Sequence, residues 1–400
     1  MNNSHITKPI SVLIPDGDTN NAVAVVRCLG ESKNSKIFVL SKDEDKPVRY
    51  SRYISKYIYI PRGESKQEQL AAIVKAIKQT NADVLLPIHI ETIRLVSEYK
   101  EQLSELISIA PVPEVGSFDI ADDKHLLSLW LQENNIPHPK TIFFDKNRDL
   151  DEVVSSIKFP IIVKPTIGFG GTGIEIIENS NELQLWHNRI DQSGDYIFQS
   201  YIKGYDIDCS VISVEGKIHV HTIQKSIKNN EDDTWAIAME FLQDEAVYSV
   251  VQEVIEKFNW SGVVNIGLRY DKETNQINLI EMNPRFWASV SASIFAGANF
   301  PYYSCLLGLG QELPEITYTN KIVIRTSPAF KMIMRKVLLR TYQKFDNTYL
   351  ELNIKDPVPT FMKEFYKYSI KLRRNGSVTS VNLWTSLTNR FSSLVNLGQR

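Results

Sequence analysis

Three side chains that could bind a metal and a phosphate lie at alternate positions near the end of an apolar run: Glu281, Asn283 and Arg285. In an extended chain, residues two apart point to the same face, so these side chains can act on one ligand. Carboxylate and amide oxygens are hard ligands that suit Mg²⁺, and a guanidinium is a rigid cation for a phosphate. The spacing therefore predicts a site for a magnesium-bound triphosphate.

A lysine followed closely by glycines supports the same prediction. Lys164 ends a β-rich run and precedes Pro165, so its ammonium should point from a strand end into a cleft. The loop behind it contains four glycines: Gly168, Gly170, Gly171 and Gly173. Glycine allows the backbone to approach phosphates closely. A hairpin turn is the alternative, but the loop is longer and richer in glycine than a minimal turn requires.

Five segments, in this order along the chain, resemble the ATP-grasp superfamily of ligases: Asp123-Lys124, Val163-Lys164-Pro165, the loop 168–173, the segment 198–206 and Leu279–Arg285. The segments Val12–Asp18 and Val26–Gly30 resemble the N-terminal domain of carbamoyl-phosphate-synthase-like members. The resemblance extends over roughly residues 8–310, and five motifs in order make it specific.

The resemblance implies a nucleotide site. Lys124 and Lys164 would bind phosphates, and the glycine loop would close over the β- and γ-phosphates. Gln199 would bind the adenine amino group, and the backbone of Tyr201 or Ile202 would complete the adenine edge. Asp206 would hold the ribose hydroxyls, although an aspartate before a strand is often only a turn former.

The resemblance also implies a metal site and a residue facing the transferred phosphoryl group. Glu281 and Asn283 would bind Mg²⁺, with Mn²⁺ as an alternative, and Arg285 would hold the γ-phosphate. The family's first metal ligand falls at Gly267, which has no side chain, and Asn265 on the same face could replace it. Lys225 would face the transferred phosphoryl group. A structural polar cluster is the alternative for Glu281, Asn283 and Arg285.

The activity implied by the resemblance is that of a carboxylate–amine ligase, which uses ATP to activate a carboxylate as an acyl phosphate and couples it to an amine. Its substrates would be small molecules, and nothing in the sequence indicates a nucleic acid partner. Two alternatives stay open. Gly267 favours a nucleotide-binding protein with little or no catalysis, and the N-terminal resemblance favours a single-module carboligase or carbamoyl-phosphate-synthase-like enzyme.

The elements that must position these residues alternate between strands and helices at the start of the chain, which indicates a parallel sheet covered by helices. With the resemblance, this predicts an α/β chain with the ATP-grasp fold. The expected units are a Rossmann-like domain at 1–112, a linker helix and lid at 113–200, a C-terminal α+β subdomain at 201–312 and a basic helical extension at 313–400. We expect the linker helix to run from about Asp122 to Asn134.

Two further groups of polar residues have weaker predictions. His89, Glu91 and the segment Asp16–Asp18 follow strands of the first unit, and ligands bind at that edge of open parallel sheets. They are therefore candidates for the acceptor pocket. His219 and His221 alternate on one strand, but no third metal ligand has suitable spacing, so we interpret them as packing or substrate-contact residues.

The C-terminal extension is basic although the whole chain has a formal charge of -2. In Phe330–Phe345 and Phe361–Arg374, apolar residues recur at helical spacing beside lysines and arginines. Residues 330–374 could contact an anionic membrane surface, but docking on the acidic body is the favoured interpretation. The three cysteines are widely spaced and no apolar run is long enough to span a bilayer. We expect a cytoplasmic protein, peripheral at the inner membrane if the tail binds lipid, and the oligomeric state is open, a homodimer included.

Overall fold

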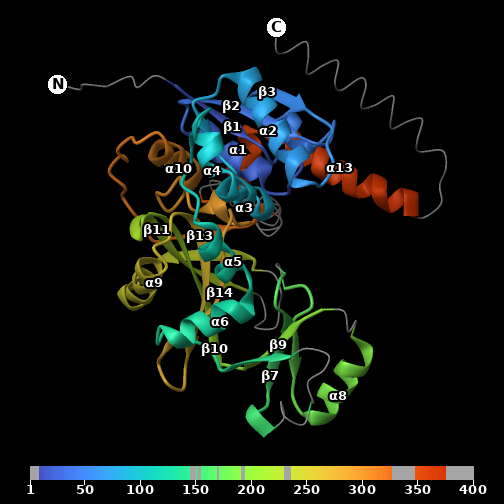
Figure 1. Cartoon of the computed structure of the whole chain (residues 1–400), viewed down its shortest axis with the longest axis vertical. Coiled ribbons are helices and arrows are strands. Elements are labelled where there is room, and N and C mark those ends of the chain that lie inside the picture. Colours follow the sequence, from blue (N-terminus) through green and yellow to red (C-terminus); the bar gives the residue numbers. More distant parts are fainter. Residues whose placement is uncertain are drawn as a thin grey trace, which may run out of the picture.

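The computed structural model describes residues 9–144, 150, 155–168, 171–190, 194–228, 236–326 and 347–374, with the side chains of the last helix described up to residue 366. Three sheets form the body of this described chain, and they follow one another from top to bottom in Figure 1. The first is parallel and the other two are antiparallel.

The first sheet has five parallel strands in the order β3-β2-β1-β4-β5. Its strands and helices are β1 Ile10–Ile14, α1 Ala22–Glu31, β2 Ser35–Ser41, η1 Pro47–Tyr50, β3 Ile54–Tyr59, α2 Lys66–Thr80, β4 Val84–Leu85, α3 Ile90–Glu98, α4 Lys100–Ser104 and β5 Ser108–Ile109. Both faces are buried, as parallel sheets require. Val12 and Ile14 point into one core and Leu13 into the other, because side chains alternate along a strand.

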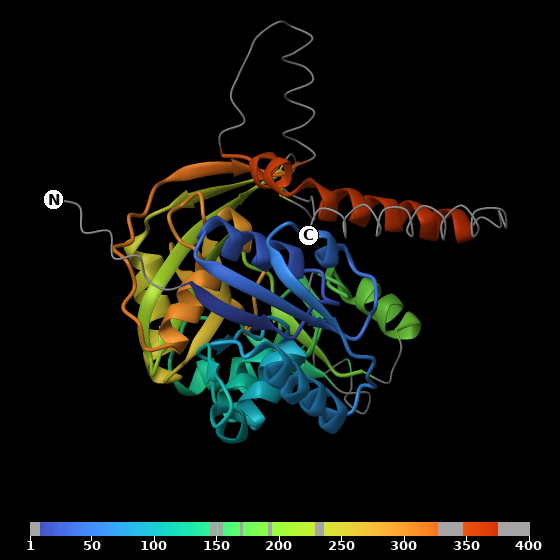
Figure 2. The same ribbon diagram turned by 90° about the horizontal axis from the view of Figure 1, so that it is seen from above.

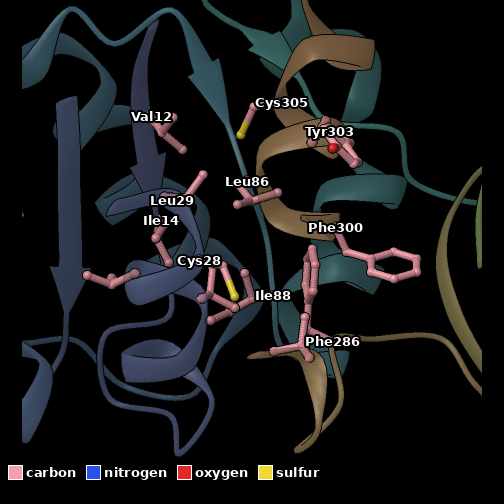
Figure 3. Packing of buried hydrophobic residues seen from close by; sticks show 14 of the residues in the cluster. Val12, Ile14, Cys28, Leu29, Leu86, Ile88, Phe286, Phe300, Tyr303 and Cys305 are labelled. Carbon is pink, nitrogen blue, oxygen red and sulfur yellow. The ribbon is translucent and has the colours of Figure 1, made fainter. Parts of the chain in front are cut away.

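One face of this sheet is covered by residues from far along the chain. Helix α10, Phe300–Gly308, packs with α1 on that face. Figure 3 shows Phe286, Phe300 and Cys305, from the later part of the chain, in one cluster with Val12 and Leu86 of the first unit. The opposite face is covered by α2, α3 and α5. The first unit therefore shares its hydrophobic core with residues 286–309.

The second sheet has six antiparallel strands in the order β14-β13-β10-β11-β12-β15. Its strands and helix are β10 Gly204–Val214, β11 Lys217–Ile227, β12 Ala238–Leu242, α9 Glu245–Lys257, β13 Gly262–Asp271, β14 Ile277–Asn283 and β15 Lys321–Ile324. Helices α6 and α9 cover one face through a single apolar cluster. A short η2, Val290–Ala292, follows β14. Because β15 starts beyond residue 312, this sheet uses part of the extension.

The third sheet is small and forms the lid at the lower right of Figure 1. Its strands, in the order β6-β9-β7-β8, and its helix are β6 Thr141–Phe144, β7 Ile161–Pro165, β8 Glu175–Ile177, α8 Ser180–Arg189 and β9 Tyr196–Ser200. Trp186 of α8 packs against Phe144 and Phe198 in its core. The end of β7 places Lys164 beside the second sheet.

The linker between the first two units contains two helices, α5 Val115–Asp122 and α6 Lys124–Glu133. The helix expected from about Asp122 to Asn134 is confirmed as α6, and α5 precedes it. Asp123 separates them because its carboxylate caps α6, accepting hydrogen bonds from the backbone N–H groups of His125 at 2.8 Å and Leu126 at 3.0 Å. The break places Lys124 in the first turn of α6.

The tail begins with α12, Tyr349–Lys355, and continues as α13, Pro357–Arg374. The helix expected at Phe361–Arg374 is confirmed, whereas the stretch Phe330–Phe345 lies outside the described residues. Figure 2 shows α13 starting against the N-terminal unit and extending beyond it. None of the helices in the described ranges is both long and apolar enough to cross a membrane.

The tail is attached to the N-terminal unit by a buried ion pair. Asp356, which is 1% exposed, accepts hydrogen bonds from Arg27 Nε at 3.2 Å, Ser51 Oγ at 2.9 Å and the Arg52 backbone N–H at 3.0 Å. Arg27 also donates to Asn353 Oδ1 at 2.6 Å. Here the acid comes from the tail and the base from the body. The basic character of the tail therefore does not account for this contact.

Candidate nucleotide and metal site

The strongest sign of an anion site is the buried cation at the end of β7. Lys164 is 2% exposed, and no acceptor for its ammonium is found among the described residues. Burial lowers its pKa to about 8, although the charge of Glu281 raises it, and Lys124 lowers it further. A buried ammonium without a hydrogen-bond partner is costly, so the cleft is arranged to receive an anion.

A second lysine holds the glycine loop. Lys124 Nζ donates to the carbonyl oxygen of Gly168 at 2.9 Å and to that of Thr166 at 3.4 Å. Gly171 and Gly173 both have φ near 76°, a left-handed conformation that favours glycine. Gly170 lies outside the described residues. Lys124 thus ties the loop to α6, and its contact with a phosphate stays a prediction.

The three residues at the end of β14 lie together. Asn283 Nδ2 donates to Glu281 Oε1 at 2.9 Å, and Arg285 donates to Asn283 Oδ1 at 3.3 Å. Burial lowers the pKa of Arg285, while the charges of Glu281 and Asp122 raise it. Because Glu281 also acts on Lys164 electrostatically, β14, β7 and the start of α6 meet at one place. Asp122 was not expected there.

Six residues of three neighbouring strands form a polar block on the face away from α9. Asp208 of β10 lies opposite Gly267 of β13, and Gly267 lies opposite Glu281 of β14. In the next row, Ser210, Asn265 and Asn283 correspond in the same way, and Asn265 Nδ2 donates to Ser210 Oγ at 3.1 Å. Residues opposite each other on antiparallel strands share a face.

Asp208 was missed in the sequence. Burial raises its pKa to about 7, and the neighbouring charge of Glu281 raises it as well. Its position two residues after Asp206 on a strand was the available signal, because alternation puts both on one face. It could not be used without knowing which strand lies beside Gly267.

The residues expected to bind adenine and ribose lie between the second and third sheets. Gln199 is buried and donates through Nε2 to Thr141 Oγ1 at 3.0 Å, which orients its amide. The Tyr201 N–H donates to Pro160 O at 3.3 Å. Arg269, another residue that was missed, donates to the carbonyl of Ile202 at 2.6 Å and to Asp206 at 2.5 Å. The backbone groups left for adenine are therefore the Tyr201 carbonyl and the Ile202 N–H.

Lys225 requires a correction. It lies opposite Ile207 on β10, whereas its neighbour Gln224 lies opposite Asp208. Lys225 is therefore on the other face of the sheet, with its ammonium 3.9 Å from the centroid of the Tyr205 ring. Side chains alternate along a strand, but the sequence alone does not show which face each residue takes. The pairing with β10 puts Lys225 on the face away from the polar block. Asp206 instead has Arg269 at 2.5 Å and Lys228 at 3.9 Å as its basic neighbours.

The candidate acceptor residues lie at the carboxyl edge of the first sheet, but Asp16 has a structural role. Its buried carboxylate accepts from the backbone of Ile88 at 2.7 Å and from Thr92 Oγ1 at 2.5 Å. This edge does face the polar block, because Asn21 Nδ2 donates at 2.8 Å to the carbonyl of Phe286, the residue after Arg285.

The remaining acceptor candidates and the strand histidines lie as follows. His89 precedes α3 and Glu91 is in its first turn. Asp18 lies 3.8 Å from Arg62. His221 packs between the rings of Tyr248 and Tyr318, with centroids 4.6 and 4.9 Å away. Within the described ranges no three His, Cys, Asp or Glu side chains form a metal cluster, so any metal here also needs amide ligands.

Comparison with known proteins agrees with this geometry. Residues 121–289 match the family model of the ATP-grasp domain. The chain is 22% identical over 296 residues to D-aspartate ligase of Enterococcus faecium, covering 67% of this chain and 70% of that protein. It is 23% identical over 222 residues to the C-terminal section of the carbamoyl phosphate synthase large chain of Methanopyrus kandleri, covering 50% of this chain but only 39% of that protein.

A solved structure extends the likeness beyond the matched domain. N5-carboxyaminoimidazole synthetase from Staphylococcus aureus, complexed with ADP, superposes with a TM-score of 0.61 at 19% identity, covering 79% of this chain and 80% of that one. The predicted ATP-grasp fold is therefore confirmed.

Proposed function

We propose that the chain, whose residues 121–289 form an ATP-grasp domain, is an ATP-dependent ligase that joins a small-molecule carboxylate to an amine. One observation carries the proposal: the buried Lys164 has no acceptor among the described residues and lies in the field of Glu281, whose charge also acts on Arg285. That arrangement supplies an anion site next to hard oxygen ligands. The D-aspartate ligase relative supports the choice of an amine as the nucleophile.

The residues fit a magnesium-bound triphosphate. Glu281 and Asn283 present a carboxylate and an amide to a metal, which when bound would neutralise charge on the phosphates. Lys164 would hold the leaving diphosphate, and Arg285 would stabilise the charge on the γ-phosphoryl group. Gln199 would select adenine through its free carbonyl oxygen. These groups act by position and charge, as phosphoryl transfer requires.

The proposed reaction has two steps. A carboxylate oxygen of the first substrate attacks the γ-phosphorus, the bond to the β-phosphate oxygen breaks, and ADP leaves. The amine nitrogen of the second substrate then attacks the acyl carbon of the acyl phosphate. The carbon–oxygen bond to phosphate breaks, inorganic phosphate leaves, and the nitrogen loses a proton to give an amide.

The test uses hydroxylamine as a general amine. The full chain is incubated with Mg²⁺, ATP, hydroxylamine and pooled carboxylates, and the products are analysed by mass. We expect ADP and one hydroxamate, both lost in Glu281→Ala and both retained in Glu253→Gln, a control on the exposed face of α9. Intact ATP despite measurable ADP binding would contradict the proposal.

Two alternatives are separated by the same assay. Gly267 favours a nucleotide-binding protein without turnover, which would bind ADP and leave ATP intact. A carboligase would release ADP only when bicarbonate is added and would form no hydroxamate from organic carboxylates. A homodimer is a further proposal, which sedimentation would test. Contact of α13 with lipid is another, which vesicle binding would test.

A further inference from the structure

We propose that Asp208 supplies the carboxylate that the metal site lacks at Gly267, so that the metal is held across three strands by Asp208, Glu281 and Asn283. The inference rests on the proposed function, because it assigns a ligand to the metal of that nucleotide site. It also removes the main reason for regarding the chain as inactive.

The register of the sheet carries the first step. Asp208, Gly267 and Glu281 occupy one row across β10, β13 and β14. Adjacent strands lie about 4.8 Å apart, so the two carboxylates flank a glycine from either side on one face. Asn283 lies one row along on the same face, next to Glu281 at 2.9 Å. Two carboxylates and one amide side chain thus share the face of the sheet around Gly267.

Gly267 keeps that space open. A Cβ at this position would lie 3.0 Å from Glu281 Cγ and 3.6 Å from Glu281 Oε1. Glu281 therefore leans over β13 toward β10, where Asp208 lies. A longer side chain at 267 would occupy the same volume. Position 267 on β13 has no side chain to bind the metal, and Asp208 on the neighbouring strand β10 supplies a carboxylate in its place.

The surroundings of Asp208 indicate a missing cation. Among the described residues no lysine or arginine pairs with it, and the nearest charged groups that act on it are Glu281 and Asp206. Its polar neighbour Gln224 forms a side-chain hydrogen bond with it and also donates through Nε2 to Ser289 Oγ at 3.0 Å, so its hydrogen-bonding neighbour in the described part of the chain is a neutral amide. Buried charges in proteins are paired or coordinate metals. Glu281 has Lys164 and Arg285 acting on it, whereas no cation acts on Asp208 among the described residues, so a divalent cation between the two acids would balance the charge of Asp208.

Asn265 is the weaker candidate for the same role. It is 8% exposed, and its amide nitrogen is held by Ser210. Its neutral oxygen would add no charge to the site, whereas affinity for hard dications rises with the number of charged ligands. Asp206 is not available either, because Arg269 holds it at 2.5 Å.

The test measures metal binding rather than turnover. Mn²⁺ is titrated into the full chain with ADP present, and free Mn²⁺ is followed by electron paramagnetic resonance. Removing a ligand should cost at least the 10–100-fold typical of losing an outer-shell partner, so we expect Asp208→Asn to weaken Mn²⁺ binding by about tenfold or more. Asp208→Glu should restore part of it, and Asn265→Ala and Glu253→Gln should change it less than about threefold.

ADP binding without metal, measured by calorimetry in EDTA, separates the possible failures. We expect Asp208→Asn to bind ADP like the wild type in EDTA, which also shows that it is folded. If Mn²⁺ binding is unchanged in Asp208→Asn, the inference is overturned while the proposed function survives. If the wild type binds neither ADP nor Mn²⁺, both fail. A loss in Asn265→Ala with none in Asp208→Asn would assign the ligand to Asn265.

Discussion

At Lys164, stability and function oppose each other. The folded chain holds this ammonium in a buried place without an acceptor among the described residues, and its pKa is lowered to about 8. One pKa unit corresponds to about 1.4 kcal/mol, so at neutral pH the charge costs the folded state up to about 3 kcal/mol. The same charge is what a diphosphate needs.

We therefore predict that Lys164→Met raises the free energy of unfolding of the nucleotide-free protein by about 1–3 kcal/mol and weakens ADP binding. A charge-assisted hydrogen bond contributes about 1.5–3 kcal/mol, which corresponds to roughly 10–100-fold in affinity. Urea unfolding and calorimetry measure the two effects. The mutation Lys158→Met, of a lysine in the same unit with an exposed side chain, is the control, and a loss of both stability and affinity at residue 164 would contradict the prediction.

Single residues were predicted well where their chemistry is carried by a local motif. Glu281, Asn283, Arg285 and Lys164 converge as expected, because alternation along one strand fixes which side chains share a face. Asp208 and Lys225 depend on how β10, β11 and β13 are aligned, which a single sequence does not contain. Asp208 was therefore missed, and Lys225 was placed on the wrong face.

At the scale of elements, the effect of a Gly→Ala substitution on stability should depend on the backbone conformation of the glycine that is replaced. Gly173 has φ near 76°, and a Cβ there would lie 3.3 Å from Pro165 Cδ. We predict that Gly173→Ala destabilises the lid by about 1–2 kcal/mol and weakens ATP binding.

The matched control for this loop is a helical glycine. Gly116 lies in α5, and a Cβ there would meet no atom within 4 Å. Gly116→Ala should stabilise the protein by about 0.5–1 kcal/mol. Thermal unfolding of both variants measures the difference. Equal effects of the two substitutions would show that the left-handed conformation of Gly173 does not matter for stability.

The packing of β11 against α9 should depend on pH. Burial lowers the pKa of His221, which lies between Tyr248 and Tyr318, below its usual value near 6.5. The unfolded chain therefore binds the proton more tightly, so this contribution to stability is present above about pH 6.5 and is lost as the pH falls. We predict a smaller decrease in unfolding free energy from about pH 7 to 5 in His221→Phe than in the wild type. Parallel pH profiles would exclude His221 as a cause.

The helices expected from about Asp122 to Asn134 and at Phe361–Arg374 were predicted to within a few residues, as α6 and the later part of α13. The start of α6 at Lys124 lies within two residues of the predicted one, because acids near a helix start are a local signal. β12 and β15 were not predicted, because short strands carry little signal of their own; β12 pairs with β11, and β15 pairs with β12 at the edge of the sheet.

At the scale of the whole molecule, the tail is attached by a pair of buried charges. Asp356→Ala would leave Arg27 buried without its partner, and breaking a buried ion pair from one side costs about 3–5 kcal/mol. We predict a loss of that size in urea unfolding. Glu351→Ala, which breaks only a partly exposed pair with Lys355, should cost less than about 1 kcal/mol.

The double variant Arg27→Met with Asp356→Leu gives the contradicting outcome. Replacing both charges by apolar groups is often neutral or stabilising, so it should be more stable than Asp356→Ala. If it is no more stable, the ion pair is not what attaches the tail. From the charge asymmetry of the sequence, we expected the basic residues of the tail to hold it on the body. The contact is instead made by one acidic residue, Asp356, which stands among many lysines and arginines and was therefore overlooked.

The core shared by the first sheet and α10 has a consequence for synthesis on the ribosome. All five parallel strands have been made by residue 109, but α10, which shares the cover of one of their faces with α1, starts only at Phe300. At about 5–20 residues per second, the nascent chain carries an apolar sheet surface for roughly 10–40 s before its cover arrives. During that interval the growing polypeptide presents a target for chaperones, and its early half depends on its late half to finish folding.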